Sequence, residues 1–342
     1  MSRLVFSEVN HEEQTDEDQQ LTRLIARPMP GNLSLSFGRD PSYLKACARC
    51  GPPRRVLIAK DKDKIVALTS FFLRRYWWNE EPQEIWTLSD FRALPSKAGF
   101  GITGQGWRAL RQLLDHKPAI ISVVADNPRA LALFSKPRPG WPRLHPVGDL
   151  RTNLTPLLFT GPPKNRRYLT RPLTAEELQK ALKDSRPPLQ PVVEDDDFGT
   201  TLPPTHDYWG VFDNDDTLLG FAGLHDQSAH RQIRIHSYAG WYQTLAKLRL
   251  LPKPGREIPL RTASLLHCPD PKAWVALKQR LEHEAKQQKA KFLVWCKAGR
   301  APLNLSFAYR SRIYQLVWEG EKPLPALAKE GQHPLSFEVA WL

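Results

Sequence analysis

One stretch in the first half of the chain constrains the fold most, because it joins three structural patterns without interruption. Residues 84–94 (EIWTLSDFRAL) are rich in β-branched and aromatic side chains and favour a strand. From Trp107 onward, apolar residues recur at helical spacing. Between the two lie Lys97 and four glycines, namely Gly99, Gly101, Gly104 and Gly106. The stretch therefore predicts a strand, a glycine-rich loop and a helix.

A glycine-rich loop before a helix can direct several backbone N–H groups toward one anion, at the positive end of the helix dipole. The pyrophosphate of a cofactor is the natural candidate for this anion. An ordinary glycine-rich turn explains the loop equally well, because an isolated glycine pattern is a weak signal. The loop alone leaves both readings open.

The residues after the helix favour the cofactor reading. Residues 119–125 (AIISVVA) form a near-continuous apolar run, typical of a strand buried on both faces. The run leads directly into DNPRALALFSK at residues 126–136. The order of strand, glycine loop, helix, strand and then this DN…LF…K segment resembles the GCN5-related N-acetyltransferase (GNAT) superfamily.

The resemblance implies a binding site for acyl-CoA. In this superfamily the loop holds the pyrophosphate, the preceding strand pairs with the pantetheine arm, and a strand N–H, here within residues 89–93, polarises the thioester carbonyl. The implied cofactor-binding residues are Phe91, Ala93, Lys97, Gly99, Gly101, Gly104, Gly106, Asn127 and Phe134. The implied cofactor is acetyl-CoA or another acyl-CoA, and the implied partner is an amine acceptor, which could be a small molecule, a peptide or a protein.

The sequence departs from the superfamily pattern in two places. The usual loop is R/Q-x-x-G-x-G/A; Gly104 and Gly106 match the glycine pair, but Gly101 stands at the R/Q position, so Lys97 would supply the charge. Phe134 stands where a tyrosine usually protonates the departing thiolate. Phenylalanine cannot donate a proton. Another group or water would replace it, or the site is catalytically weak.

Acyl transfer also requires a neutral amine, and therefore a route for its proton. Glu84 and Asp90 lie on the predicted strand and are the candidate catalytic bases, directly or through water, although either carboxylate could be structural. No serine stands in a G-x-S-x-G elbow, which argues against a hydrolase triad. We predict no metal site, because neither the Cys47-x-x-Cys50 pair nor His225, His230 and His236 have the spacing of metal ligands.

The 342 residues are enough for two domains. We expect a disordered acidic tail over residues 1–20, a GNAT-like acyl-CoA-binding domain over residues 21–162, and a degenerate GNAT-like domain over residues 163–342. The second unit repeats the order of hairpin, strand, helix and strand, but HCPDP at residues 267–271 replaces the glycine loop. The predicted fold class is α/β (α+β), with two GNAT-like domains, each a mixed, mostly antiparallel sheet flanked by helices.

Charge and composition limit the function further. The net charge of +13 suits an anionic partner such as CoA phosphates or nucleic acid, but no nucleic-acid-binding motif stands out, so nucleic acid is possible without being favoured. Few cysteines and no long apolar run predict a cytoplasmic protein with no membrane partner. The leading hypothesis is an N-acyltransferase that moves an acyl group, acetyl in the first instance, from acyl-CoA to an amine. The alternatives are a non-catalytic acyl-CoA-binding or sensor protein and a basic nucleic-acid-binding protein on the same scaffold.

Overall fold

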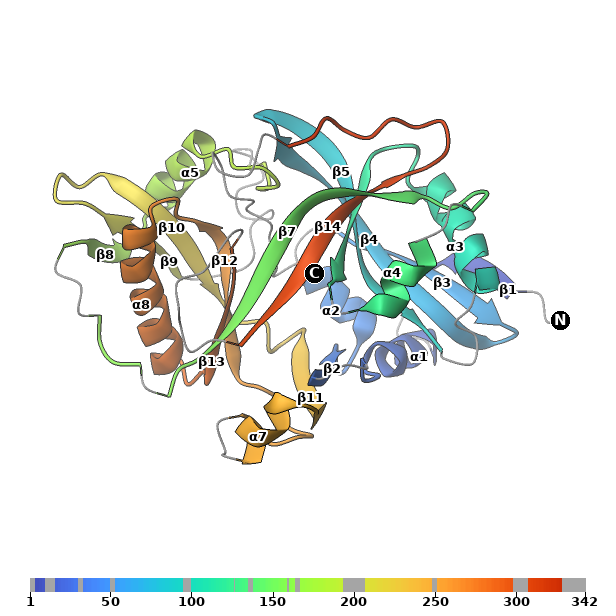
Figure 1. Cartoon of the computed structure of the whole chain (residues 1–342), viewed down its shortest axis with the longest axis horizontal. Coiled ribbons are helices and arrows are strands. Elements are labelled where there is room, and N and C mark those ends of the chain that lie inside the picture. Colours follow the sequence, from blue (N-terminus) through green and yellow to red (C-terminus); the bar gives the residue numbers. More distant parts are fainter. Residues whose placement is uncertain are drawn as a thin grey trace.

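The computed structural model describes residues 4–9, 16–29, 33–49, 53–94, 100–125, 127–134, 138–158, 160–163, 167–192, 207–247, 251–297 and 307–327. These residues form one 12-stranded sheet, in the order β1-β3-β4-β5-β6-β14-β7-β13-β12-β10-β9-β8, and a separate two-stranded sheet of β11 and β2. Helices cover the large sheet, which runs through the whole molecule (Figure 1). Among the described residues, no helix is both long and apolar enough to cross a lipid bilayer.

The first half of the chain runs from β1 to β7. Its elements are β1 (Leu4–Glu8), α1 (Asp16–Ile25), β2 (Leu33–Gly38), α2 (Tyr43–Arg49), β3 (Arg55–Asp61), β4 (Lys64–Trp78), β5 (Glu81–Ala93), α3 (Phe100–Leu113), β6 (Ala119–Val124), α4 (Pro128–Phe134) and β7 (Arg143–Pro156). The expectation of a disordered tail over residues 1–20 is wrong for residues 4–8 and 16–20, because β1 pairs with β3 and α1 begins at Asp16. α1 is helical because Leu21, Leu24 and Ile25 are spaced to share one buried face.

The second half contains a matching series. Its elements are β8 (Leu169–Pro172), α5 (Ala175–Asp184), β9 (Asp207–Phe212), β10 (Leu218–His225), β11 (Gln232–Tyr238), α7 (Trp241–Lys247), β12 (Leu260–His267), α8 (Pro271–Gln287), β13 (Phe292–Lys297) and β14 (Phe307–Val317). α5 begins with the predicted capping box of Thr174 and Glu177. Each half contains one parallel pair joined through a helix, β5 with β6 and β12 with β13. The last predicted strand, residues 334–342, lies outside the described residues.

The two halves exchange strands. β14, from the end of the described chain, lies between β6 and β7 and pairs antiparallel with both. β7, from the first half, also pairs with β13 of the second half. Figure 1 shows the long strands β7 and β14 side by side at the centre of the molecule. The predicted division at residues 162 and 163 therefore needs correction, because residues 307–317 join the sheet of the first half.

The two faces of the first-half sheet carry different helices. Leu57, Phe71 and Leu88 pack against Trp107 of α3 on one face. Neighbouring strand residues of opposite orientation pack against α1 and α2 on the other face, namely Val56, Ile58, Ile65 and Leu68. We call these the α3 face and the α2 face of the sheet.

Candidate acyl-transfer site

The candidate site lies where β5 and β6 separate. The two strands are parallel and pair only over Trp86–Leu88 and Ala119–Ile121, although β5 continues to Ala93 and β6 to Val124. Beyond Leu88, the edge of β5 that faces β6 has no ladder partner among the described residues. Within the described part of the chain, no neighbouring strand accepts the backbone N–H groups on that edge, so a ligand inserted between the strands could bind them.

A β-bulge at Asp90 marks the point of separation. Leu68 pairs with Arg92 and Ser70 pairs with Ser89, so that two residues of β5 stand opposite the single Thr69 of β4. Asp90 adopts a left-handed backbone, with φ 55°. The bulge also interrupts the alternation of side chains, because Ser89 and Asp90, which are consecutive, both hydrogen-bond Ser70 on the α2 face.

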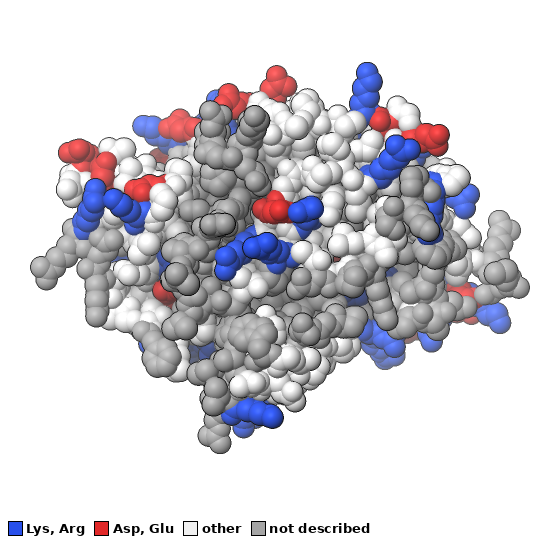
Figure 2. Space-filling model, viewed as in Figure 1, with Lys and Arg blue, Asp and Glu red and all other residues white. Residues whose placement is uncertain are grey.

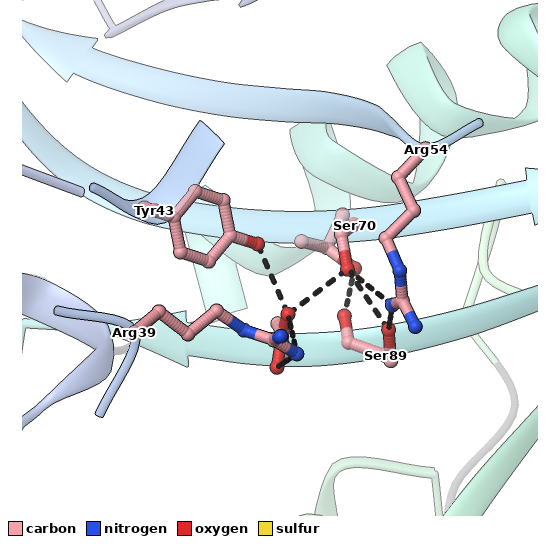
Figure 3. A network of polar contacts seen from close by, with 7 residues as sticks. Arg39, Tyr43, Arg54, Ser70 and Ser89 are labelled. Carbon is pink, nitrogen blue, oxygen red and sulfur yellow. Dashed lines mark hydrogen bonds and ion pairs between the residues drawn. The ribbon is translucent and has the colours of Figure 1, made fainter. Parts of the chain in front are cut away.

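The Asp90 carboxylate is the centre of a buried polar network on the α2 face. Figure 3 labels five other members of this network, namely Arg39, Tyr43, Arg54, Ser70 and Ser89. Arg39 Nη2 donates to both carboxylate oxygens, at 3.3 and 3.0 Å, and the Tyr43 hydroxyl donates at 3.1 Å. Ser70 Oγ donates to the same carboxylate at 3.2 Å. Arg54 reaches the network through Ser89 Oγ at 2.7 Å. We call Arg39, Tyr43, Arg54, Ser70, Ser89 and Asp90 the bulge network.

Charge in the bulge network keeps Asp90 ionised. Burial opposes the charged form, but the positive charges of Arg39, Arg54 and Arg231 outweigh it and hold the pKa of Asp90 well below its usual range. Burial first, and then the Asp90 charge, raise the pKa of Tyr43, so its hydroxyl remains a donor. A carboxylate with a lowered pKa that is fully hydrogen-bonded is a weak proton acceptor. Its geometry suits it to hold the bulge.

The second half reaches this network through the connection between β10 and β11. His230 is 4% exposed, and burial, followed by the charges of Arg39 and the adjacent Arg231, lowers its pKa to about 4. The His230 ring therefore stays neutral at pH 7. His225 lies beside it, with ring centroids 5.5 Å apart. The described residues contain no group of His, Cys, Asp and Glu that could hold a metal ion.

Aromatic side chains occupy the α3 face next to the same gap. Phe91, 39% exposed, stacks on Trp107 at 5.5 Å between ring centroids. Phe134, at the end of α4, contacts the other side of this group, 5.5 Å from Trp107 and 6.4 Å from Trp141. The structure thus brings the predicted residues Phe91 and Phe134 together around one tryptophan.

The predicted glycine loop needs correction. α3 begins at Phe100, well before Trp107, so Gly101, Gly104 and Gly106 are helical residues. Only the first four N–H groups of a helix lack a partner within it, which here means those of residues 100–103. Gly101 lies in this first turn, whereas Gly104 and Gly106 lie beyond it. Lys97 and Gly99 lie outside the described residues.

Gly104 has a packing role that the sequence did not indicate. A Cβ atom added there would lie 2.8 Å from Nε1 of Trp141, so the glycine allows α3 to approach the indole ring. Asn127 is exposed, and its Oδ1 accepts the N–H of Ala130, as a helix N-cap does. Contact of either residue with acyl-CoA stays a prediction.

The second predicted base lies away from the site. Glu84 is near the start of β5, exposed, and forms an ion pair with Lys117 at 2.7 Å. The structure does not bring it to the bulge network.

In the second half, Asp270 of the HCPDP segment caps α8. The same segment packs tightly, because a Cβ atom at Gly220 would lie 2.6 Å from Cys268 Sγ.

Sequence reasoning missed most of the bulge network. Arg39 and Arg54 lie in connections with no recognisable motif, and Ser70 lies inside a mostly buried strand. One signal was present. Serines within a buried strand, followed on the next strand by Ser-Asp, place polar groups where a sheet normally buries apolar ones, and such groups need partners.

Comparison with known proteins supports the fold. The sequence matches no protein-family model and no curated protein sequence. The structure is similar to N-myristoyltransferase of Saccharomyces cerevisiae with bound myristoyl-CoA, with a TM-score of 0.61 and 12% identity, covering 98% of this chain and 85% of that one. It is also similar to a GCN5-related N-acetyltransferase from Sphaerobacter thermophilus, with a TM-score of 0.56 and 12% identity. This similarity covers 94% of this chain and 98% of that one. The predicted GNAT-like fold is thereby confirmed.

Proposed function

We propose that this chain, which has a GNAT-like fold, is an acyl-CoA-dependent N-acyltransferase whose thioester lies in the gap between β5 and β6. The observation that carries the proposal is the coincidence of the Asp90 bulge with the early end of the β5–β6 ladder. Among the described residues, the two features leave backbone N–H groups of β5 without a ladder partner at the point where β5 and β6 separate. The solved structures with this fold that are named above are acyltransferases, which supports the same reading.

Backbone N–H groups in Ser89–Ala93 would stabilise the negative charge that develops on the thioester oxygen. The amine nitrogen attacks the thioester carbon, the C–N bond forms as the C–S bond breaks, and the amine loses a proton as the thiolate leaves. Asp90 is a positioning residue in this scheme, because its carboxylate is held ionised by three arginines and fixes the bulge. The amine proton passes to water or to the acceptor's own groups.

The phosphates of CoA would meet the first turn of α3. The N–H groups of a first helical turn point outward along the helix axis, and together with the positive end of the helix dipole they favour an anion there. Ile102 and Thr103 of this turn line the same small pocket as Phe91 and Trp107. Acetyl-CoA is the simplest donor for the reaction.

Phe134 favours a second reading, a protein that binds acyl-CoA without turnover. No proton donor stands at this position, and the ring packs between Trp107 and Trp141. A general nucleic-acid role has less support. On the face shown in Figure 2, the described basic side chains are scattered among acidic ones.

The test measures acyl-CoA affinity by calorimetry, and then thiol release with a panel of amines. The informative variant is Gly101→Asp. An acidic side chain in the first turn stabilises a helix but repels phosphates. The affinity for acyl-CoA should therefore fall at least tenfold, while the melting temperature does not decrease. The matched control is Gln105→Asp, exposed one turn later in α3, which should leave affinity unchanged.

Four results are informative. Binding with thiol release supports the enzyme, and binding without release for any amine supports the sensor. Unchanged affinity in Gly101→Asp would place the phosphates elsewhere. Absence of binding by the wild-type protein would overturn both readings.

A further inference from the structure

A small cavity lies beside the candidate site, between α3 and the strands β3, β4 and β5. Its volume is about 40 Å³, and its lining is apolar apart from Thr69 and Thr103. Phe91 and Trp107 belong both to this cavity and to the aromatic group beside the β5–β6 gap. The cavity therefore begins where the thioester would lie.

The cavity has an identifiable cause in the sequence. Ala59 of β3 pairs with Ala67 of β4, and Ala67 pairs with Ala93 of β5, so three alanines form a row across three neighbouring strands. All three line the cavity from the sheet side. Gly106 of α3 lines it from the helix side, where the nearest atom to an added Cβ would be Phe6 Cε1, at 3.4 Å. Small residues thus face one another where a helix packs on a sheet.

Such an arrangement is unusual for a protein core. Interiors are close-packed, and an unfilled apolar space costs stability in proportion to its volume. Valine or leucine at Ala67 would fill the space with ordinary strand residues. Apolar cavities that persist tend to stay dry and can bind apolar ligands. An apolar ligand attached to a group in the gap is the occupant that this position suits.

We propose that the acyl group of the donor is longer than acetyl and that its tail lies in this cavity, which we call the α3 cavity. The proposal rests on the function proposed above and adds the class of donor. A water-sized group needs about 10–15 Å³ of such space, so the α3 cavity has room for about three carbon atoms. The carbonyl carbon and the next carbon would lie in the gap, so the expected acyl group has about five or six carbons in total.

The test is a chain-length series. Acetyl-, butyryl-, hexanoyl- and decanoyl-CoA are titrated into the wild-type protein and into Ala67→Leu. For the wild type, affinity should rise about fourfold with each added methylene as far as hexanoyl, and then stop rising. In Ala67→Leu the side chain fills the α3 cavity, so hexanoyl-CoA should bind no better than acetyl-CoA.

Two controls separate this outcome from damage to the fold. Unchanged affinity for acetyl-CoA shows that Ala67→Leu is folded, and Ala67→Val is the smaller replacement if it is not. Ala175→Leu, at an exposed position at the start of α5, should preserve the wild-type chain-length profile.

The outcomes also separate this proposal from the function on which it rests. The α3 cavity is not the acyl site if the wild type binds all chain lengths with equal affinity, or if both Ala67 variants keep the preference for longer chains. Either result leaves the acyltransferase proposal unaffected. Absence of binding for every acyl-CoA overturns the proposed function and this inference with it.

Discussion

At the residue scale, Asp90 shows how one buried side chain can hold a local distortion of a strand. Its left-handed backbone belongs to the bulge, and its carboxylate accepts hydrogen bonds from Arg39, Tyr43 and Ser70. The sequence placed Asp90 on the correct strand and proposed it as a base. It could not show the arginines that lower its pKa, because they come from connections distant in the chain.

We expect Asp90→Asn to destabilise the protein by about 3 kcal/mol at pH 7, since it leaves buried arginines without their carboxylate. Asparagine tolerates the left-handed backbone, so the change removes charge without adding strain. The pKa of Asp90 is lower in the folded state than in the unfolded state. Its ionised carboxylate therefore contributes its full stabilisation above the unfolded-state pKa of about 4. This stabilisation is lost as the pH falls through the lower folded-state pKa. The difference in unfolding free energy between the wild type and Asp90→Asn, measured with urea, should therefore be smaller near pH 3 than at pH 7.

Asp115→Asn is the matched control, because Asp115 also has a positive φ, 48°, but is exposed. Its effect should stay within about 0.5 kcal/mol. Equal losses in the two variants, or a loss at Asp90 that does not change with pH, would contradict the role assigned to the carboxylate.

Phe134 tests the catalytic reading at the same scale. Phe134→Tyr restores a proton donor for the thiolate, and a general acid contributes about 10²-fold or more. With saturating acyl-CoA, turnover should therefore rise by about a hundredfold or more, while acyl-CoA affinity changes little. Phe134→Leu, which removes the ring and adds no donor, should not raise the rate. An equal response of the two variants would mean that Phe134 does not face the thioester.

At the element scale, α3 shows why boundaries are harder to predict than elements. Glycine weakens a helix by about 1 kcal/mol relative to alanine, so four glycines in eight residues favour a loop. The helix nevertheless begins at Phe100. Tertiary packing overrides the local preference, because Gly104 admits the indole of Trp141. The Thr174 capping box, which is local, was predicted to the residue and confirmed.

Gly104→Ala should therefore destabilise the protein by about 1 kcal/mol, despite the better helix propensity of alanine. Gly106→Ala, whose Cβ would meet only Phe6 at ordinary contact distance, should be neutral or stabilising by up to about 1 kcal/mol. Thermal unfolding measures both, and Trp141→Phe should relieve the Gly104→Ala clash. Stabilisation by Gly104→Ala would show that α3 is not held against Trp141.

At the scale of the whole molecule, the exchange of β7 and β14 decides how the halves behave. The sequence indicates that both segments are strands. Strand pairing is non-local, however, and the period-two pattern of a strand does not determine which strand it pairs with. The structure places β14 between β6 and β7 and pairs β2 with β11, so backbone ladders cross between the halves in both sheets. The halves are joined by hydrogen-bonded sheet, as well as by the connection over residues 160–167.

We therefore expect a protein cut within residues 160–167 to stay in one piece under native conditions. Ile313 and Leu316 of β14 are buried, at 0% and 1% exposure, and release of the second fragment would expose them together with the edges of β6 and β7. A specific protease site inserted in this segment, followed by size-exclusion chromatography, should give a single peak that separates into two fragments only in denaturant. The first fragment expressed alone, residues 1–163, should aggregate, and co-expression with the second should restore solubility. Two stable monomeric fragments after native cleavage would show that each half completes its own sheet, and the exchanged topology would then be wrong.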